Sequence, residues 1–199
     1  MGNTRFYIEK VSFKTQKDAK LDCIPMLLRR KLSNLDKLAI STINSVFDDN
    51  IEEFIFSSQY GEFERLFSII EQYTKNNEVS PIAFSASVHN YIGGILSLVK
   101  HSTIPYYAIS AGENSLSYGL IKSIISKKRV LYCYADNFQK EQSVSLIISP
   151  DFTKDTTCVE FQKKKSTCQN SEYESFYKFL NGELPTFNTD LGEFNVIHN

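Results

Sequence analysis

The sequence lacks several features that define specialised classes of protein. Its 199 residues contain no tryptophan, and 22 lysines and arginines nearly balance 23 aspartates and glutamates. A nucleic-acid-binding protein needs a basic face, and this balance gives no reason to expect one. The longest apolar run, residues 92–99, is interrupted by glycines and is too short to cross a bilayer. We therefore expect neither a nucleic-acid partner nor a membrane span.

Cysteine is sparse and has no metal-ligand spacing. The four cysteines form no Cys-x-x-Cys pair, which argues against a zinc ribbon or a thioredoxin motif: they are Cys23, Cys133, Cys158 and Cys168. The charged N-terminal segment has no apolar core of a secretory signal. A long chain without such a signal favours reduced thiols and a cytoplasmic location. Cys133 stands in an apolar strand with no base nearby in sequence, so we interpret it as an inert buried thiol.

The common nucleotide and catalytic signatures are also missing. There is no Gly-x-Gly-x-x-Gly, no phosphate-binding P-loop and no Gly-x-Ser-x-Gly elbow. The three histidines, His89, His101 and His198, are not spaced as metal ligands. We therefore expect no cofactor and no metal.

The composition is that of an ordinary globular domain, with 42% apolar and 23% charged residues. Apolar periodicity predicts helices after Ser33, whose Ser-Asn-Leu-Asp sequence resembles a capping box, and over residues 62–75, 88–100 and 115–126. It predicts strands over residues 5–13, 53–58, 105–110, 130–135 and 143–149, the last antiparallel to its predecessor. Such alternation indicates an α/β domain with a mainly parallel sheet and helices on both faces.

Beyond Pro150 the pattern is weaker. We predict a strand over 157–162, a short helix over 172–180 and an irregular tail from Pro185. Within the helix predicted over 88–100, Gly93 and Gly94 suggest close approach of another element or a ligand, because glycine is costly inside a helix.

Two groups of residues are candidates for chemistry. His89 lies near Ser87 at a predicted helix start, where it could act as general base for the serine hydroxyl, although a structural histidine that bonds a loop is the favoured interpretation. An acyl pocket could be lined by Phe56, Tyr60, Phe84 and Tyr91, although aromatic residues near helix starts more often belong to the core. The run from Arg29 to Lys31, which includes Arg30, could grip a phosphate on a carrier protein, although a solvated charge run is favoured.

Three segments together resemble the short β-ketoacyl synthase-like family, the N-terminal half of a ketosynthase. They are Pro25-Met-Leu-Leu-Arg-Arg-Lys-Leu-Ser33, Phe56-Ser-Ser-Gln-Tyr-Gly-Glu62 and Ser80-Pro-Ile-Ala-Phe-Ser-Ala-Ser-Val-His-Asn90. The third block is the specific one, and the resemblance runs from about Cys23 to Ser149. It implies a thiolase-like half-fold, a five-stranded mixed sheet that is mostly parallel with its last strand antiparallel. Residues 1–150 would form the ketosynthase-like domain and residues 151–199 an extension of unknown role.

The resemblance also bears on catalysis. In active ketosynthases a strand leads into a Thr-Ala-Cys-x-Ser turn at a helix N-terminus, whose dipole favours the thiolate. Here the matching turn carries Gly112 in place of the cysteine, followed by Ser115. Two catalytic histidines of the ketosynthase C-terminal half have no counterpart. The resemblance therefore implies a subunit that is non-catalytic by itself, like a chain length factor.

The implied partners are a ketosynthase and an acyl carrier protein in fatty-acid or polyketide biosynthesis of the aryl-polyene type. The strand over 105–110 would lie at the dimer seam with an open edge, and Phe84 or Tyr91 would limit the acyl chain. His89, Asn90 and Ser87 of the specific block are further pocket or interface candidates. Two alternatives stay open: an independent acyl transferase or thioesterase that uses Ser87 and His89, and a homodimer.

Overall fold

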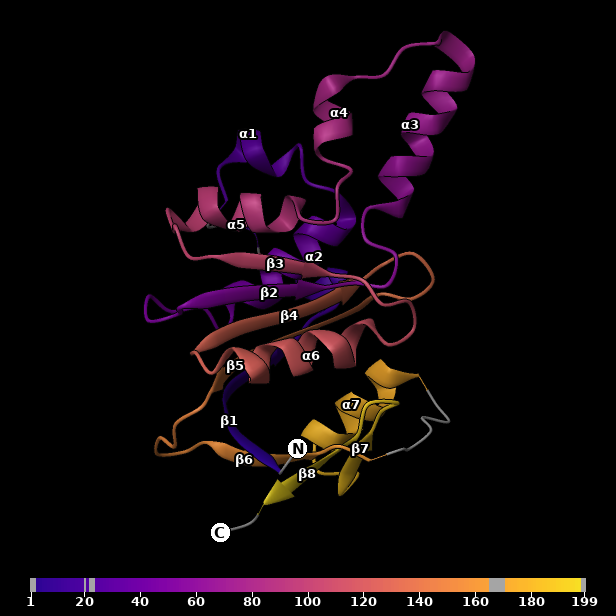
Figure 1. Ribbon diagram of the computed structural model, residues 1–199. Helices are drawn as coiled ribbons and strands as arrows, with labels where there is room; N and C mark the ends of the chain where they lie inside the picture. The colour runs from indigo at the N-terminus through magenta and orange to yellow at the C-terminus, as the bar shows by residue number, and fades with distance from the viewer. Residues whose placement is uncertain (1–2, 20, 22–23, 165–170, 198–199) are drawn as a thin grey trace.

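The computed structural model describes residues 3–19, 21, 24–164 and 171–197, and they form one continuous sheet with helices packed on it (Figure 1). The sheet has eight strands in the order β3-β2-β4-β5-β1-β6-β8-β7. The strands are β1 (Thr4–Phe13), β2 (Glu53–Ser57), β3 (Tyr106–Ile109), β4 (Val130–Asp136), β5 (Gln142–Ser149), β6 (Thr157–Gln162), β7 (Thr186–Asn188) and β8 (Glu193–Ile197). β2 pairs in parallel with β3 and β4, and the other pairings are antiparallel.

Helices cover both faces of the sheet, as the α/β pattern predicts. They are α1 (Met26–Arg29), α2 (Asn34–Asn44), α3 (Phe63–Asn76), α4 (Pro81–Ser85), α5 (Tyr91–Lys100), α6 (Ser115–Ser126) and α7 (Glu172–Leu180), with a short 3-10 helix at Gln16–Asp18. α2 and α5 pack on one face, against Phe54, Phe56 and Leu131. α6 and α7 pack on the other, against Ile55 and Tyr132. Successive strand residues point to opposite faces, so β2 and β4 supply both cores and are buried throughout.

The expectation of a five-stranded, mostly parallel sheet is wrong. Six strands were visible in the sequence pattern, but β7 and β8 form where we predicted an irregular tail. Their segments are short and weakly patterned, so tertiary packing determines them rather than local propensity. Phe187 and Phe194 are fully buried, and their rings stack with centroids 5.5 Å apart beside α7. The parallel pairings are confined to one end of the sheet, where β2 lies between β3 and β4.

Several local predictions are confirmed. Ser33 caps α2 through a reciprocal capping box with Asp36, with both hydrogen bonds present. β5 is the antiparallel neighbour of β4. The strand over 157–162 and the helix over 172–180 have the predicted bounds. The helix predicted from residue 88 begins later, at Tyr91, because α4 is a separate short helix before it.

The two glycines of α5 differ in their surroundings. A Cβ on Gly93 would lie 2.1 Å from Cδ2 of the Tyr106 ring on β3, so this glycine lets the helix pack closely against the sheet edge. A Cβ on Gly94 would meet nothing within 4 Å. The predicted close approach therefore holds for Gly93 alone.

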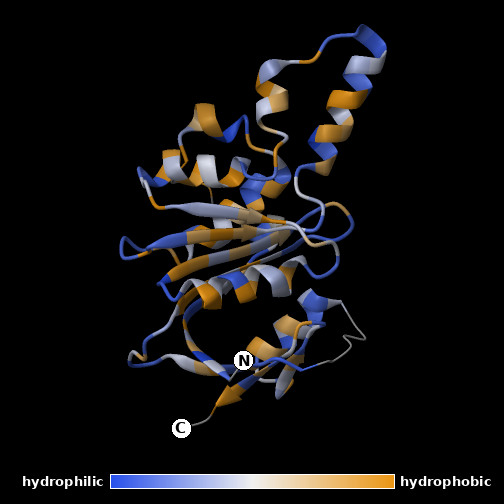
Figure 2. Cartoon of the chain, in the orientation of Figure 1, coloured by the Kyte–Doolittle hydropathy of each residue, from blue (hydrophilic) through white to orange (hydrophobic). Residues whose placement is uncertain are grey.

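Helices α3 and α4 project away from the sheet as an arm (Figure 1). Figure 2 shows hydrophobic segments on both of these helices. Many of the arm's apolar side chains are exposed: Phe63, Leu66, Phe67, Ile70, Tyr73, Ile82 and Phe84. In α3 only Ile69 is buried. The arm therefore presents an apolar surface that this chain leaves uncovered in its described residues.

Candidate functional site

The candidate residues gather at the ends of the parallel strands β2, β3 and β4. Parallel strands end at the same edge of a sheet, and this edge is where open α/β sheets bind ligands. Asp136 closes β4, and its carboxylate accepts hydrogen bonds from Ser58 Oγ (2.6 Å), Gln59 N (2.8 Å) and Tyr60 N (3.0 Å). Asp136 thereby fixes the loop that leaves β2, which carries part of the Phe56–Glu62 motif.

The turn between β3 and α6 holds Gly112 at a φ of +59°, in the left-handed region. A Cβ there would meet nothing within 4 Å, so the position is open although its backbone conformation is special. Ser115 fixes the turn: its Oγ accepts from Ala111 N at 2.9 Å and donates to the carbonyl of Gly112 at 2.7 Å. The Ser110 hydroxyl donates to the carbonyl of Gln59 at 3.3 Å. The turn is therefore rigid, and it offers no side chain at its centre.

His89 is tied to the same turn. Its Nε2 lies 3.0 Å from the carbonyl oxygen of Ile109, the last residue of β3. A carbonyl only accepts, so Nε2 carries the proton in this bond. The ring packs closely over Gly61, where a Cβ would be 2.5 Å from Nδ1. Gly61, with a φ of +56°, thus makes room for the imidazole. His89 is thus held between Gly61 and the end of β3.

Ser87 and His89 are not joined by a hydrogen bond in the described part of the chain. The Ser87 hydroxyl instead donates to the carbonyl of Phe84, at 2.8 Å within the α4 turn. Phe84 itself is 60% exposed on α4 and faces away from the core. Asn90 precedes α5 as its N-terminal cap residue without a side-chain capping bond.

Tyr91 begins α5 beside a buried charged cluster that the sequence analysis missed. The Arg65 guanidinium lies 5.5 Å from the centre of the Tyr91 ring and donates to Glu62 (2.9 Å) and Asp36 (3.1 Å). Ser33 also donates to Glu62, at 2.7 Å. Burial, followed by the negative charge of Glu62, raises the pKa of the Asp36 carboxyl to about 7. The cluster joins the base of the arm to the start of α2.

Arg29 and Arg30 lie at the end of α1, on the same side of the sheet as α5 (Figure 1). Arg29 is half-buried and donates through Nη2 to the carbonyl of Ile24 at 3.1 Å. Arg30 is exposed, with the Met26 sulfur 3.7 Å from its Nη2. Of the two, Arg30 has the guanidinium that is more accessible to an outside phosphate.

The C-terminal extension contributes a buried carboxylate to the first turn of α6. Glu172, at the start of α7, is 7% exposed, and its Oε2 accepts from Ser117 N at 3.1 Å. Its Oε1 has no hydrogen-bond partner in the described structure. Burial raises the pKa of the Glu172 carboxyl to about 7. The Glu172 carboxyl thus occupies the N-terminal end of α6, where a helix presents backbone N–H groups without intrahelical partners.

A polar cavity of about 490 Å³ separates this carboxylate from the turn that carries Gly112. Its lining includes Glu113 and Asn114 of the turn, Gln59 and Tyr60 of the β2 loop, and Glu172. Sequence reasoning missed Glu172 and Asp136. Asp136 had a usable signal, a carboxylate that ends a buried strand, whereas nothing in the sequence connects Glu172 with residue 117.

Other sequence-based expectations concern thiols, metals and membranes. Burial raises the pKa of the Cys133 thiol to about 12, which agrees with an inert thiol, and Cys133 and Cys158 are both free and buried. Cys23, Cys168 and His198 lie outside the described residues. Among the residues with described positions, no cluster of three or more potential ligands could hold a metal ion. No helix in those same ranges is long and apolar enough to cross a membrane.

Comparisons with known proteins identify a sequence family and solved structures that share the fold. The family model described as "Beta-ketoacyl synthase, N-terminal domain" matches residues 8–169. A chain in the structure of the ketosynthase ApeO in complex with its chain length factor ApeC, from Xenorhabdus doucetiae, has a TM-score of 0.77 at 18% identity. That match covers 97% of this chain and 99% of the other. A search of curated proteins found no match.

Two further solved structures share the fold over part of their length. A chain of the ishigamide ketosynthase/chain length factor has a TM-score of 0.58 at 12% identity, over 75% of this chain and 51% of that one. A chain of the AntDE:AntF complex, a type II polyketide synthase acyl-carrier protein with its hexaketide-bound ketosynthase, has a TM-score of 0.52 at 10% identity. That match covers 74% of this chain and 64% of the other.

Proposed function

Because the chain belongs to the β-ketoacyl synthase N-terminal domain family, we propose that it is a ketosynthase-like subunit with no condensing activity of its own. It pairs with a ketosynthase, an acyl carrier protein or both, and shapes an acyl-chain pocket. The biosynthetic setting is fatty-acid or polyketide synthesis of the aryl-polyene type. The fold shared with ketosynthase and chain length factor complexes supports this proposal.

The observation that carries the proposal is the turn at Gly112. Acyl transfer through a covalent intermediate needs a nucleophile, and glycine has none. The two neighbouring hydroxyls are engaged, because Ser110 donates to Gln59 and Ser115 bridges the backbone of the turn. The Glu172 carboxyl already occupies the N-terminus of α6, where its Oε2 accepts from Ser117 N. The turn thus keeps a helix-start geometry without the group that would react there.

Two exposed features suit a partner subunit. β3 ends the order of strands, so its outer edge carries backbone groups without a strand partner in the described sheet. Beside it, the α3–α4 arm exposes the apolar residues Phe67, Ile70 and Ile82. Apolar patches rimmed by polar residues mark protein interaction sites. In the proposed complex the arm and the β3 edge contact the ketosynthase.

The remaining candidates have proposed roles near that interface. Phe84 and Tyr91 limit the acyl chain, and Ser87, His89 and Asn90 hold the segment that positions them. Gly112 and Ser115 form the adjoining wall. Arg30, with Arg29 behind it, contacts the phosphate of a carrier-protein arm.

The test is co-expression of the tagged chain with the ketosynthase encoded in its gene neighbourhood, followed by affinity purification and gel filtration. We expect a stable complex that Ile82→Glu weakens at least about tenfold, because it places a charge in an apolar contact. Leu98→Glu is the matched control, since Leu98 is equally exposed (65% against 69%) on α5 and outside the arm.

Failure to form a complex with either the ketosynthase or the acyl carrier protein would overturn the proposal. Hydrolysis of acyl thioesters by the chain alone, lost in both Ser87→Ala and His89→Ala, would establish the stand-alone enzyme in its place. Gel filtration of the chain by itself detects a homodimer.

A further inference from the structure

A second cavity lies between α6 and the C-terminal strands, on the other side of the sheet from the arm. Its volume is about 400 Å³, within the usual range of about 300–1,000 Å³ for small-molecule sites. Its walls are mainly apolar and come from three elements and a turn: Ile121, Ile124 and Ile125 of α6, Phe161 of β6, Thr4 of β1, and Leu191 before β8. A ligand in this cavity would therefore bury an aliphatic or aromatic body.

Two lysines complete the lining, Lys127 at the end of α6 and Lys163 after β6. Both are exposed, and neither takes part in an ion pair or a side-chain hydrogen bond within the described structure. Their neighbours Lys128 and Lys164 are paired, with Glu53 (3.1 Å) and Glu193 (3.2 Å). Of these four lysines, the two without a salt-bridge partner are therefore the two that line the apolar cavity.

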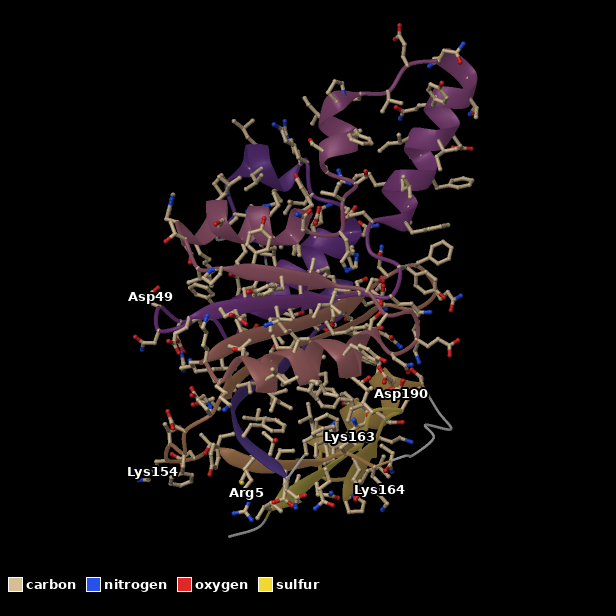
Figure 3. All side chains as sticks on the ribbon, viewed as in Figure 1. Arg5, Asp49, Lys154, Lys163, Lys164 and Asp190 are labelled. Atoms are coloured by element: carbon tan, nitrogen blue, oxygen red, sulfur yellow. The ribbon has the colours of Figure 1, made fainter. Side chains whose placement is uncertain are left out.

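The strand register explains this difference. Side chains two residues apart share one face of an extended chain, so Lys163 lies on the side of Phe161, toward the cavity. Lys164 lies on the opposite side, where it reaches Glu193 across the β6–β8 pairing. Figure 3 labels both lysines in the lower part of the molecule.

We propose that this cavity binds an aliphatic carboxylate, with its chain among the isoleucines and its headgroup near the two lysines. The carbonyl end of α6 carries about half a negative charge, which two ammonium groups outweigh. Apolar walls with cations on one side favour a ligand that is apolar at one end and anionic at the other. This site is separate from the Gly112 turn, and its test does not depend on the proposed function.

Calorimetric titration of the purified full chain with decanoate, below the critical micelle concentration at pH 8, tests the proposal. Affinity should increase about fourfold per added methylene from octanoate to decanoate, because each buried methylene contributes a constant increment. Decanol and decyltrimethylammonium serve as headgroup controls. Both should bind more weakly than decanoate, since neither is attracted by the lysines.

Two pairs of variants locate the site. Lys163→Gln combined with Lys127→Asn should weaken decanoate binding roughly two- to fivefold, as expected for exposed charges. Asparagine suits position 127, where φ is +55°. Lys164→Gln, the matched control on the opposite side of the strand, should leave binding unchanged. Ile125→Glu should weaken binding about tenfold while Leu98→Glu does not, although the two side chains are 66% and 65% exposed.

Three results would overturn the proposal. The first is no saturable binding of decanoate. The second is equal affinity for decanoate and decyltrimethylammonium, which would show general detergent binding. The third is equal loss in Ile125→Glu and Leu98→Glu, which would place the ligand elsewhere. Far-UV circular dichroism of each variant confirms that it is folded.

Discussion

The buried carboxylate of Glu172 should make the stability of this protein depend on pH, and Glu172→Gln should remove that dependence. The carboxylate is 7% exposed and has one hydrogen bond, from Ser117 N. Burial raises its pKa from 4.5 to about 7. The folded chain therefore holds this proton over a pH range in which the unfolded chain has released it. Stability contributed by the neutral carboxyl is complete below pH 4.5 and is lost as pH rises through about 7.

The size of the effect follows from the two pKa values. Each unit of difference corresponds to about 1.36 kcal/mol, so the shift amounts to roughly 3 kcal/mol over its full range. Between about pH 5 and pH 8 the wild-type free energy of unfolding should fall by about 2.5 kcal/mol relative to that of Glu172→Gln. Asp36, whose pKa is also raised, titrates in both proteins, and its contribution cancels in the difference.

The assay is urea unfolding at several pH values, followed by far-UV circular dichroism because the chain has no tryptophan. Glu174→Gln is the matched control: Glu174 lies on the same helix and pairs with Lys140, and that hydrogen bond lowers its pKa. The stability that Glu174 contributes should therefore be lost as pH falls, which is opposite in sign to the pH dependence expected for Glu172. Parallel stability curves for wild type and Glu172→Gln would refute the reasoning, because they would show that Glu172 ionises normally in the folded chain.

Three further predictions concern stability and reactivity. Gly112→Ala should lower the free energy of unfolding by about 1 kcal/mol, because alanine is strained at a φ of +59°, whereas Gly94→Ala in α5 should raise it by up to about 1 kcal/mol. Urea unfolding of both variants checks this, and equal effects would contradict it. Ser33→Ala should lower the free energy of unfolding by about 1–2 kcal/mol, and by more than Ser80→Ala, since the Ser33 cap is half-buried and also bonds Glu62. A smaller loss of stability at Ser33 than at Ser80 would be the contrary result. Cys133 should resist alkylation at pH 8 in the folded chain and react in urea, as peptide mass spectrometry would show; labelling in the folded chain would disprove its burial.

Much of the parallel half of the fold could be predicted because its signals are local. The capping box at Ser33 involves residues three apart, and the buried run over 130–135 is continuous in sequence. The tail could not be predicted in this way. Phe194 is buried by Phe6, Phe161 and Phe187, and two of these partners are more than 30 residues away, at positions 6 and 161. Three-residue strands such as β7 exist only because of such contacts.

In the candidate site too, features with local sequence signals could be predicted and contacts between distant residues could not. For His89 the sequence favoured a structural histidine over a general base, and the structure adds the contact of its Nε2 with the carbonyl of Ile109. The carboxylates could not be placed, because their partners are distant in sequence: Asp136 reaches back to Ser58, and Glu172 reaches back to Ser117. An ionisable residue in a helix's first turn is usually solvated, whereas Glu172 is buried where α7 packs against α6.

The place of β1 in the sheet has a consequence for how the chain folds. β1 (Thr4–Phe13) is near the N-terminus, yet its two neighbours are β5 (Gln142–Ser149) and β6 (Thr157–Gln162). On the ribosome the partners of this strand emerge well over a hundred residues after it. Until then β1 has two unpaired edges, while β2, β3, β4 and their crossover helices can already pair with one another. Closure of the sheet thus waits for most of the chain, and pairings this distant in sequence slow folding and prolong exposure to aggregation.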